Sequence, residues 1–128
     1  MDHQRLKLKR LLKNLDKSRG IGTSVVSLLM PPGTQVHKIS QMLTEEIGTA
    51  ENIKSRVNRQ AVLTAIASAQ TKLKQFNSCP SNGLAIYAGE VADATGKPKK
   101  VTYAIEPFRP LNTSLYRCDD RFHTDALL

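Results

Sequence analysis

The chain has 128 residues, enough for one domain with a single hydrophobic core. Its 19 lysines and arginines against 11 acids give a net charge of +8, which favours a polyanionic partner such as nucleic acid. No apolar run approaches the roughly 20 residues that a membrane span needs, so we expect no membrane association. Two cysteines and no secretory signal predict free thiols and a cytoplasmic location.

The first expected element is a helix over residues 4–17. Its apolar stripe and its basic outer surface consist of Leu8, Leu11, Leu12, Leu15, Lys7, Lys9, Arg10, Lys13 and Lys17. A basic amphipathic helix suits a membrane or a nucleic acid, but most such helices pack on a core and leave the basic face in water. This element alone therefore does not identify a partner.

A glycine-rich segment over residues 20–24 leads into an apolar run over residues 25–30, which is typical of a buried strand that Pro31 ends. We expect the glycine-rich segment to be a loop that carries the Thr23 and Ser24 hydroxyls at a bend. It precedes its strand and lacks the Gly-Lys-Thr/Ser sequence, so it does not match a phosphate-binding loop.

Two helices come next. The first is expected over residues 35–46, with Thr34 as its N-cap and Gly48 as its stop signal. The second is the longest in the chain and continues to about Phe76. Its apolar face is expected to contain Val57, Val62, Ile66, Ala69, Leu73 and Phe76. The two helices form a hairpin whose tip lies around residues 51–59.

Charges at this tip have the sign that each helix end disfavours. Lys54, Arg56 and Arg59 lie at the start of the second helix, where the helix dipole favours anions. Glu46, beside another acid, lies in the last turn of the first helix. Pairing of Glu46 with Lys54 or Arg56 would relieve this, although exposed pairs contribute only about 0–1 kcal/mol. Alternatively, the basic residues form an ordinary solvated face, or the tip contacts the phosphates and base edges of a nucleic acid.

The second half of the chain predicts a β-hairpin with strands over residues 84–91 and 100–106. A further strand is expected over residues 115–118. Asp119 is placed to cap a last helix that contains Phe122, Ala126 and Leu127.

Residues suited to catalysis or metal binding are few. Cys118 and His123 could form a nucleophile and base, and with Cys79 and His37 could surround a metal, but neither set has a recognised spacing. Structural roles are favoured for all four. We expect neither an enzyme nor a cofactor.

Three separated motifs match one family: Asn52-Ile53-Lys54-Ser55, Gly22-Thr23-Ser24, and Tyr116-Arg117-Cys118-Asp119-Asp120-Arg121-Phe122. Together with the stretches between them, they make nearly the whole chain resemble the N-terminal domain of the eukaryotic class-I translation termination factor. The resemblance implies an α+β fold. In this α/β sandwich a four-stranded, mostly antiparallel sheet lies between helices, and a helical hairpin protrudes.

The resemblance also implies a function. In that family the N-terminal domain recognises the mRNA stop codon in the ribosomal decoding site. A middle domain with a Gly-Gly-Gln tip triggers peptidyl-tRNA hydrolysis, and a C-terminal domain binds the class-II release factor GTPase. This chain has no Gly-Gly dipeptide. We therefore expect residues 1–128 to be the single decoding domain, cut from a longer protein. We also expect it to be a monomer that meets small-subunit ribosomal RNA and cannot release peptide by itself.

The residues of the family's tip carry over by position. Asn52 and Lys54 would contact the first-position uridine, and Ile53 and Ser55 would shape the loop. The residues expected at RNA phosphates are Arg56 and Arg59.

The residues of the family's purine-binding wall carry over in the same way. Glu46 would accept a hydrogen bond from the exocyclic amine of adenine, and Tyr116 would stack or donate. The remaining codon-binding positions supply hydroxyls or support this wall: Thr23, Ser24, Cys118 and Phe122.

This sequence departs from the family at Glu51, where serine is usual, and at Arg117, which is more often apolar. The positions expected to modulate codon specificity are Gly22, Glu51, Val62 and Arg117. A carboxylate beside the tip could repel phosphate or alter purine choice, so which of UAA, UAG and UGA are recognised stays open. The alternative function is a generic basic RNA-binding or ribosome-associated module without codon preference.

Overall fold

The computed structural model describes residues 2–17, 20–92, 95–119, 121–124 and 127. These residues form three helices and four strands, in the order α1 (Asp2–Lys17), β1 (Gly20–Met30), α2 (Val36–Ala50), α3 (Arg56–Leu73), β2 (Leu84–Ala92), β3 (Pro98–Ile105) and β4 (Leu115–Asp119). None of the described helices has the length and hydropathy to cross a membrane.

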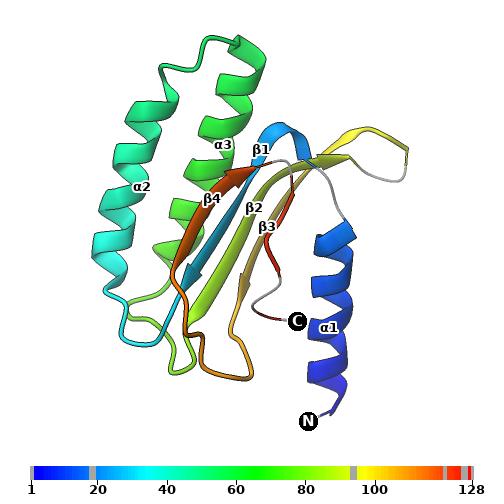
Figure 1. Cartoon of the computed structure of the whole chain (residues 1–128), viewed down its shortest axis with the longest axis vertical. Coiled ribbons are helices and arrows are strands. Elements are labelled where there is room, and N and C mark those ends of the chain that lie inside the picture. The colour runs from blue at the N-terminus through cyan, green and yellow to red at the C-terminus, as the bar shows by residue number, and fades with distance from the viewer. Residues whose placement is uncertain (1, 18–19, 93–94, 120, 125–126, 128) are drawn as a thin grey trace.

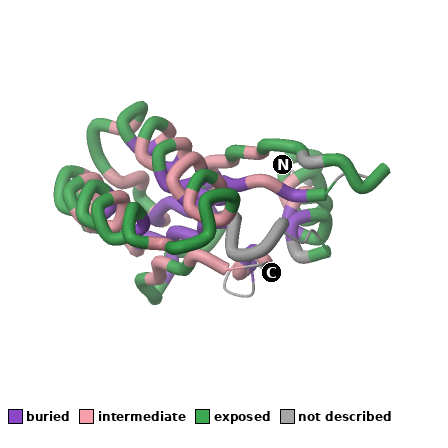
Figure 2. The backbone as a smooth tube through the Cα atoms, turned by 90° about the horizontal axis from the view of Figure 1, so that it is seen from above, coloured by how far each residue is buried: buried purple, intermediate pink, exposed green. Residues whose placement is uncertain are grey.

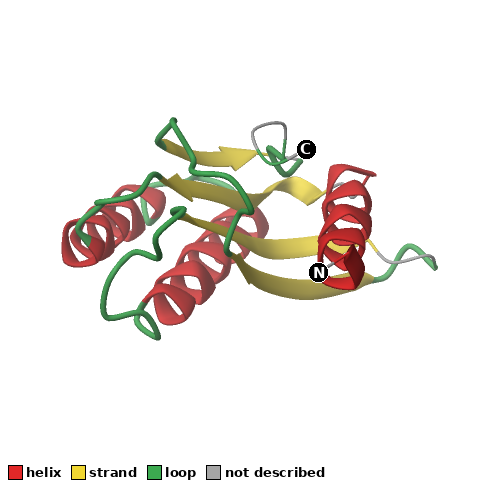
Figure 3. Ribbon diagram, turned by 90° about the horizontal axis from the view of Figure 1, so that it is seen from below, coloured by secondary structure: helices red, strands yellow, loops and turns green. Residues whose placement is uncertain are grey.

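The four strands form one antiparallel sheet in the order β3-β2-β1-β4 (Figure 1). In the interior strand β1, Leu28 lies opposite Ile86 of β2 and Tyr116 of β4. Helices α2 and α3 cover one face of the sheet and α1 covers the other (Figure 3). The predicted α/β sandwich with a four-stranded antiparallel sheet is therefore confirmed.

Side chains along β1 alternate between two hydrophobic cores. Val26, Leu28 and Met30 belong to the core beneath α2 and α3, and Val25 and Leu29 belong to the core beneath α1. Figure 2 shows the buried segments between the helix layers. Because both faces of this strand are covered, its residues 25–30 are apolar except for the buried Ser27 and do not alternate with polar residues.

The α2–α3 hairpin projects beyond the end of the sheet (Figure 1). Helix α3 packs directly on the sheet, and α2 packs on α3. Between the two helices, the Gln70 amide donates to the Ser40 carbonyl oxygen at 2.9 Å and to Thr44 Oγ1 at 2.7 Å. These bonds fix how one helix lies along the other, so the position of the tip is set by contacts between α2 and α3 away from it.

The boundaries of α2 differ from those expected. The helix continues through Gly48 to Ala50, because a single helical glycine weakens a helix by about 1 kcal/mol without ending it. Thr34 is not its N-cap: Thr34 Oγ1 donates to the Pro31 carbonyl oxygen at 2.6 Å, and Gln35 occupies the capping position without a side-chain bond. Glu46 consequently lies one turn before the helix end.

Helix α3 is shorter than expected, since it starts after Ser55 and ends at Leu73. Val57 is 77% exposed and does not belong to its apolar face. The other members of that face are buried or pack against the core. The expected apolar stripe is thus right from Val62 onward and wrong in the first turn, which lies beyond the sheet.

Two further expectations about local structure are wrong. Residues 20–24 belong to β1, with an irregular register between Gly20 and Val25, so this segment is the start of a strand. Asp119 is the last residue of β4, and residues 121–124 are not helical, so no final helix begins there. Ala126, expected in that helix, lies outside the described residues.

Candidate functional site

The joint between α2 and α3 is a tight turn held by backbone hydrogen bonds. The amides of Glu51, Asn52 and Ile53 each donate at 3.1 Å to carbonyl oxygens of the last turn of α2. The Ile53 side chain packs against the core below, whereas Asn52 and Lys54 are exposed. The turn therefore presents one carboxamide and one ammonium group outward from a fixed backbone.

Ser55 begins α3. Its backbone is extended (φ −72°, ψ 120°), and its Oγ accepts a 3.3 Å hydrogen bond from the Asn58 amide. The first turn of α3 holds no acid, and its Arg56 side chain is exposed. A basic side chain at the positive end of a helix dipole suits an anion such as phosphate.

Arg59 is partly buried against the tip. Its Nη1 donates a 3.2 Å hydrogen bond to the Ile53 carbonyl oxygen, and its backbone amide donates to the Ser55 carbonyl oxygen at 2.8 Å. The guanidinium group is thereby committed to the turn itself. Arg59 was expected to meet RNA phosphate, and the structure gives it a bracing contact that the sequence pattern did not predict.

The charges of the tip are not neutralised by one another. Within the described residues no ion pair joins Glu46 to Lys54 or Arg56, and the contact of His123 Nε2 with Asp119 Oδ2 involves none of these residues. The pairing that we considered from the sequence is therefore absent. Lys54 and Arg56 keep their charge available to a partner.

A second set of predicted residues, Glu46, Tyr116 and Cys118, comes together beside the hairpin. Burial raises the pKa of Tyr116 above its ordinary value of 10.0, and the charges of Cys118 and Glu46 add to this. Burial likewise raises the pKa of Cys118 to about 11, with smaller contributions from Asp119 and Glu46. Both side chains are thus neutral at physiological pH. The phenol can donate one hydrogen bond, and the nearby carboxylate of Glu46 can accept.

Three predicted residues lie elsewhere. Phe122 is fully buried in the core beneath α1, where its ring meets that of Tyr87 edge to face at 5.6 Å, so it does not support the wall that carries Tyr116. Val62 is buried in the core beneath α2 and α3. Arg117 is exposed on β4, and side chains of successive strand residues point to opposite faces, so it points away from Tyr116.

The Gly22-Thr23-Ser24 motif lies in the first part of β1. Its side chains lie outside the described part of the structure, but its backbone is placed: Val25 and Val26, directly after it, lie opposite Asp119 and Cys118 of β4. In Figure 1 this end of β1 and the end of β4 are at the same end of the molecule as the hairpin tip. The first part of β1, the end of β4 and the turn of the hairpin therefore lie at one end of the fold.

The family model for eRF1 domain 1 matches residues 3–128, nearly the whole chain. The chain belongs to this family.

Relatives of the chain agree with that assignment. The chain is 58% identical over 121 residues to eukaryotic peptide chain release factor subunit 1-2 of Arabidopsis thaliana and 55% identical over 121 residues to subunit 1 of Saccharomyces cerevisiae. Each match covers 94% of this chain and 28% of the relative. The chain thus spans a little over a quarter of the length of these release factors.

Solved structures give the same result for the fold of the chain. An archaeal translation termination factor, aRF1, superposes with a TM-score of 0.85 at 36% identity, covering 94% of this chain and 33% of that one. A second archaeal protein superposes with a TM-score of 0.86 at 37% identity, covering 94% and 34%. The predicted family resemblance is confirmed by both comparisons.

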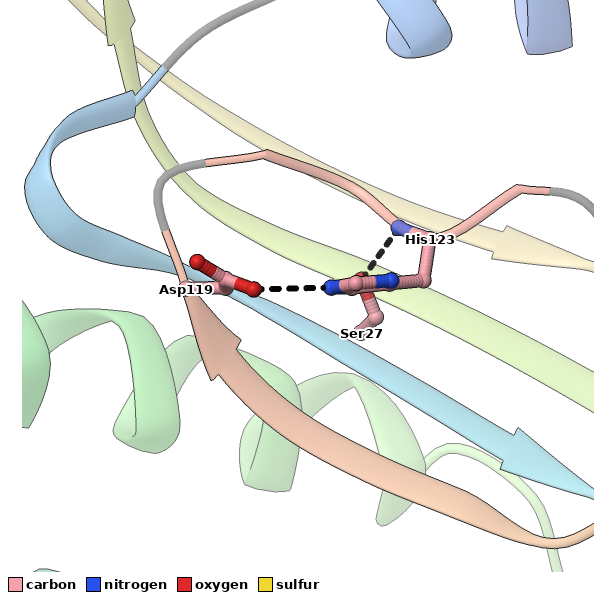
Figure 4. Close-up of polar contacts among 3 residues, drawn as sticks. All are labelled: Ser27, Asp119 and His123. Carbon is pink, nitrogen blue, oxygen red and sulfur yellow. Dashed lines mark hydrogen bonds and ion pairs between the residues drawn. The ribbon is translucent and has the colours of Figure 1, made fainter.

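The chain also contains a serine, a histidine and an aspartate close together (Figure 4). His123 Nε2 lies 3.0 Å from Asp119 Oδ2, but Ser27 Oγ accepts its 2.9 Å hydrogen bond from the backbone amide of His123. The imidazole therefore does not activate the hydroxyl as a catalytic base would. The Tyr87 hydroxyl donates to the His123 carbonyl oxygen at 2.9 Å, which completes an anchor for the segment after β4.

The alternative site residues do not assemble. Cys118 packs in the core beneath α2 and α3, and the His123 backbone is bonded to Ser27 and Tyr87 from the opposite side of the sheet. Among the described residues, no group of three or more histidines, cysteines or acids could hold a metal. The Ser27–His123 anchor was missed because a buried serine in an apolar strand gives no sequence signal until its register is known.

Proposed function

We propose that this domain recognises stop codons in mRNA at the ribosomal decoding site during translation termination. The observation that carries the proposal is the shared placement of two groups at one end of the fold. The exposed Asn52 and Lys54 stand on a braced turn, and the neutral Tyr116 phenol lies near the Glu46 carboxylate. The relatives named as release and termination factors support the process in which these groups would act.

The chemistry of the proposed site follows from the groups that it presents. Lys54 and Asn52 offer donors and an acceptor to the edge of a uridine, which an unpaired base exposes. Glu46 would accept from the exocyclic amine of adenine, and Tyr116 would donate or stack at the following purines. Arg56 would meet phosphate, because it is exposed at a helix start.

Arg59 and Cys118 have supporting roles in this proposal. Arg59 holds the Ile53 carbonyl and so keeps the Lys54 backbone in place. Cys118 packs against the same core as Tyr116, where its neutral thiol adds no charge to the wall. Thr23, Ser24 and Gly22 would complete the rim from β1, and Phe122 would act only through the sheet.

The partners of the domain are proposed on the same basis. They are the mRNA stop codon, small-subunit ribosomal RNA and the ribosome in the cytoplasm, met by a monomer without a cofactor. We propose that the domain is a binding module and not an enzyme. Peptide release, and binding of the class-II release factor GTPase, would require the parts of the relatives that this chain does not cover.

Peptide release by a fusion of this domain to the rest of a release factor tests the proposal. Lys54→Ala and Tyr116→Ala are each expected to lower the release rate at stop codons about tenfold or more, since each removes a contact to the codon. Lys74→Ala, an exposed lysine after the far end of α3, is the matched control. Unchanged release by both site variants would rule out codon recognition by these residues. Equal losses in Lys54→Ala and Lys74→Ala, with release unchanged in Tyr116→Ala, would point to binding through charge alone.

A further inference from the structure

The charge of the chain is concentrated away from the tip. Helix α1 carries six lysines and arginines and two aspartates, which gives it +4 of the net charge of +8. It packs on the face of the sheet opposite to α2 and α3 (Figure 3). This half of the net charge therefore has no function in the proposed codon site.

A pocket lies beside the N-terminal half of this helix. It has a volume of about 310 Å³ and is lined by α1 and by the segment after β3, with Leu127 closing one side. Its charged lining residues among those that the structure describes are Arg5, Lys9 and Arg109, and none of the described lining residues is an acid. A volume of about 300 Å³ or more is within the range of small-ligand sites.

The pocket also contains an exposed aromatic ring. Phe108 is 46% exposed, and the Arg5 guanidinium carbon lies 5.8 Å from the centre of its ring. The pocket floor is apolar, with Leu8, Leu12 and Pro107. Cations around an exposed ring are the combination that single-stranded nucleic acid uses, because phosphates pair with the cations and bases stack on the ring.

We propose that this pocket binds a segment of single-stranded RNA, with phosphates at Arg5, Lys9 and Arg109 and a base against Phe108. An acidic peptide would match the charge, but its carboxylates would not stack on the Phe108 ring. The exposed ring therefore favours RNA. The surface is separate from the hairpin tip and would give the domain a second RNA contact. The inference stands without codon recognition, because it can be tested on RNA that contains no stop triplet.

The test is binding of the whole chain to a fluorescein-labelled dodecauridylate RNA, measured by anisotropy over a series of salt concentrations. The double variant R5Q/R109Q is expected to weaken binding about tenfold or more. It is also expected to reduce the steepness of the salt dependence by about 1.4, from two lost phosphate contacts at about 0.7 each. The double variant K38Q/K74Q removes the same charge from exposed positions on α2 and after α3 and is the matched control.

The ring is tested separately. Phe108→Leu keeps an apolar side chain and removes the stacking surface, so the affinity is expected to fall about fivefold or more. Circular dichroism melts show whether each variant is folded. Equal affinities of R5Q/R109Q and K38Q/K74Q would overturn the pocket as an RNA site. A Phe108→Leu variant that binds like the parent, with polyglutamate competing as well as RNA, would reassign the pocket to acidic peptides.

Discussion

The guanidinium group of Arg59 donates a 3.2 Å hydrogen bond to the carbonyl oxygen of Ile53, across the turn that joins α2 to α3. An arginine in the first turn of a helix is electrostatically disfavoured there, yet this contact satisfies one carbonyl of the turn. The hydrogen bond to Ile53 therefore offsets the unfavourable interaction of Arg59 with the helix dipole, and it holds the backbone of the turn in place. Removal of the Arg59 side chain should destabilise the turn more than the hydrophobic core.

Arg59→Ala is expected to loosen the turn. Loss of one hydrogen bond to a charged donor removes roughly 1.5 kcal/mol, which corresponds to about tenfold faster exchange. Amide hydrogen exchange of Asn52 and Ile53, whose amides are bonded in the turn, measures this. Arg56→Ala, which removes an exposed arginine, should leave those rates unchanged. Equal rates in both variants would show that the bracing bond is not formed in solution.

Cys118 makes the free energy of unfolding depend on pH in the alkaline range. Its pKa is raised from 9.0 to about 11, so between these values the folded state binds more protons than the unfolded state. The resulting stability is complete below about pH 9 and is lost as pH rises toward 11. In urea titrations at pH 8, 10 and 11, the advantage of the parent over Cys118→Ala is expected to shrink steadily. An advantage that is constant or grows with pH would contradict this, and Cys79→Ala serves as the comparison thiol.

Gly83 is required by its surroundings. Its φ is +93°, and a Cβ at this position would meet the Met30 carbonyl oxygen. Gly83→Ala is therefore expected to cost about 2–3 kcal/mol of unfolding free energy, from backbone strain and displacement of β1. Gly96 has a similar φ of +82° with open space around it, so Gly96→Ala should cost about 1 kcal/mol. Thermal melts of the two variants separate the clash from the strain.

Glu51 places a carboxylate next to the exposed end of the tip. If RNA phosphate approaches Lys54, Glu51→Ser removes a repulsion of roughly 0.3–1 kcal/mol and should strengthen binding about two- to fivefold, more at low salt. Release on ribosomes programmed with UAA, UAG or UGA measures the effect for each codon. Glu45→Ser removes an exposed acid from α2 and is the control. The same gain in both variants would show that Glu51 acts only through net charge.

The sequence predicted the elements that have strong local signals. The hairpin strands β2 and β3 and the shared face of Val101, Tyr103 and Ile105 are confirmed, since alternation with turn residues at the ends is a local property. Helix α2 was expected to end two residues before Gly48 but continues past it. Whether a glycine ends a helix depends on the chain after it, which here keeps donating to the last carbonyls.

The site divides in the same way. Asn52, Lys54 and Ser55 were predicted from one continuous motif, and they share one turn. Phe122 was placed beside Tyr116 because both belong to one short motif, but the chain leaves the sheet between them and Phe122 packs on the other face. The face on which each residue packs depends on the register between strands, and the spacing of residues within one short motif does not determine that register.

Helix α2 also sets the angle about its axis between Glu46 and Lys54. Glu46 lies beside Tyr116, whereas Lys54 stands past the end of the same helix, so the rotation between the two is fixed by the residues from Glu46 to the turn. One residue of an α-helix turns the chain by about 100° and advances it by about 1.5 Å. A single deletion there would swing the lysine by roughly a quarter-turn around the helix axis while leaving every predicted residue present. The length and helical pitch of α2 therefore set the spacing between the two proposed codon contacts, through residues that make neither contact.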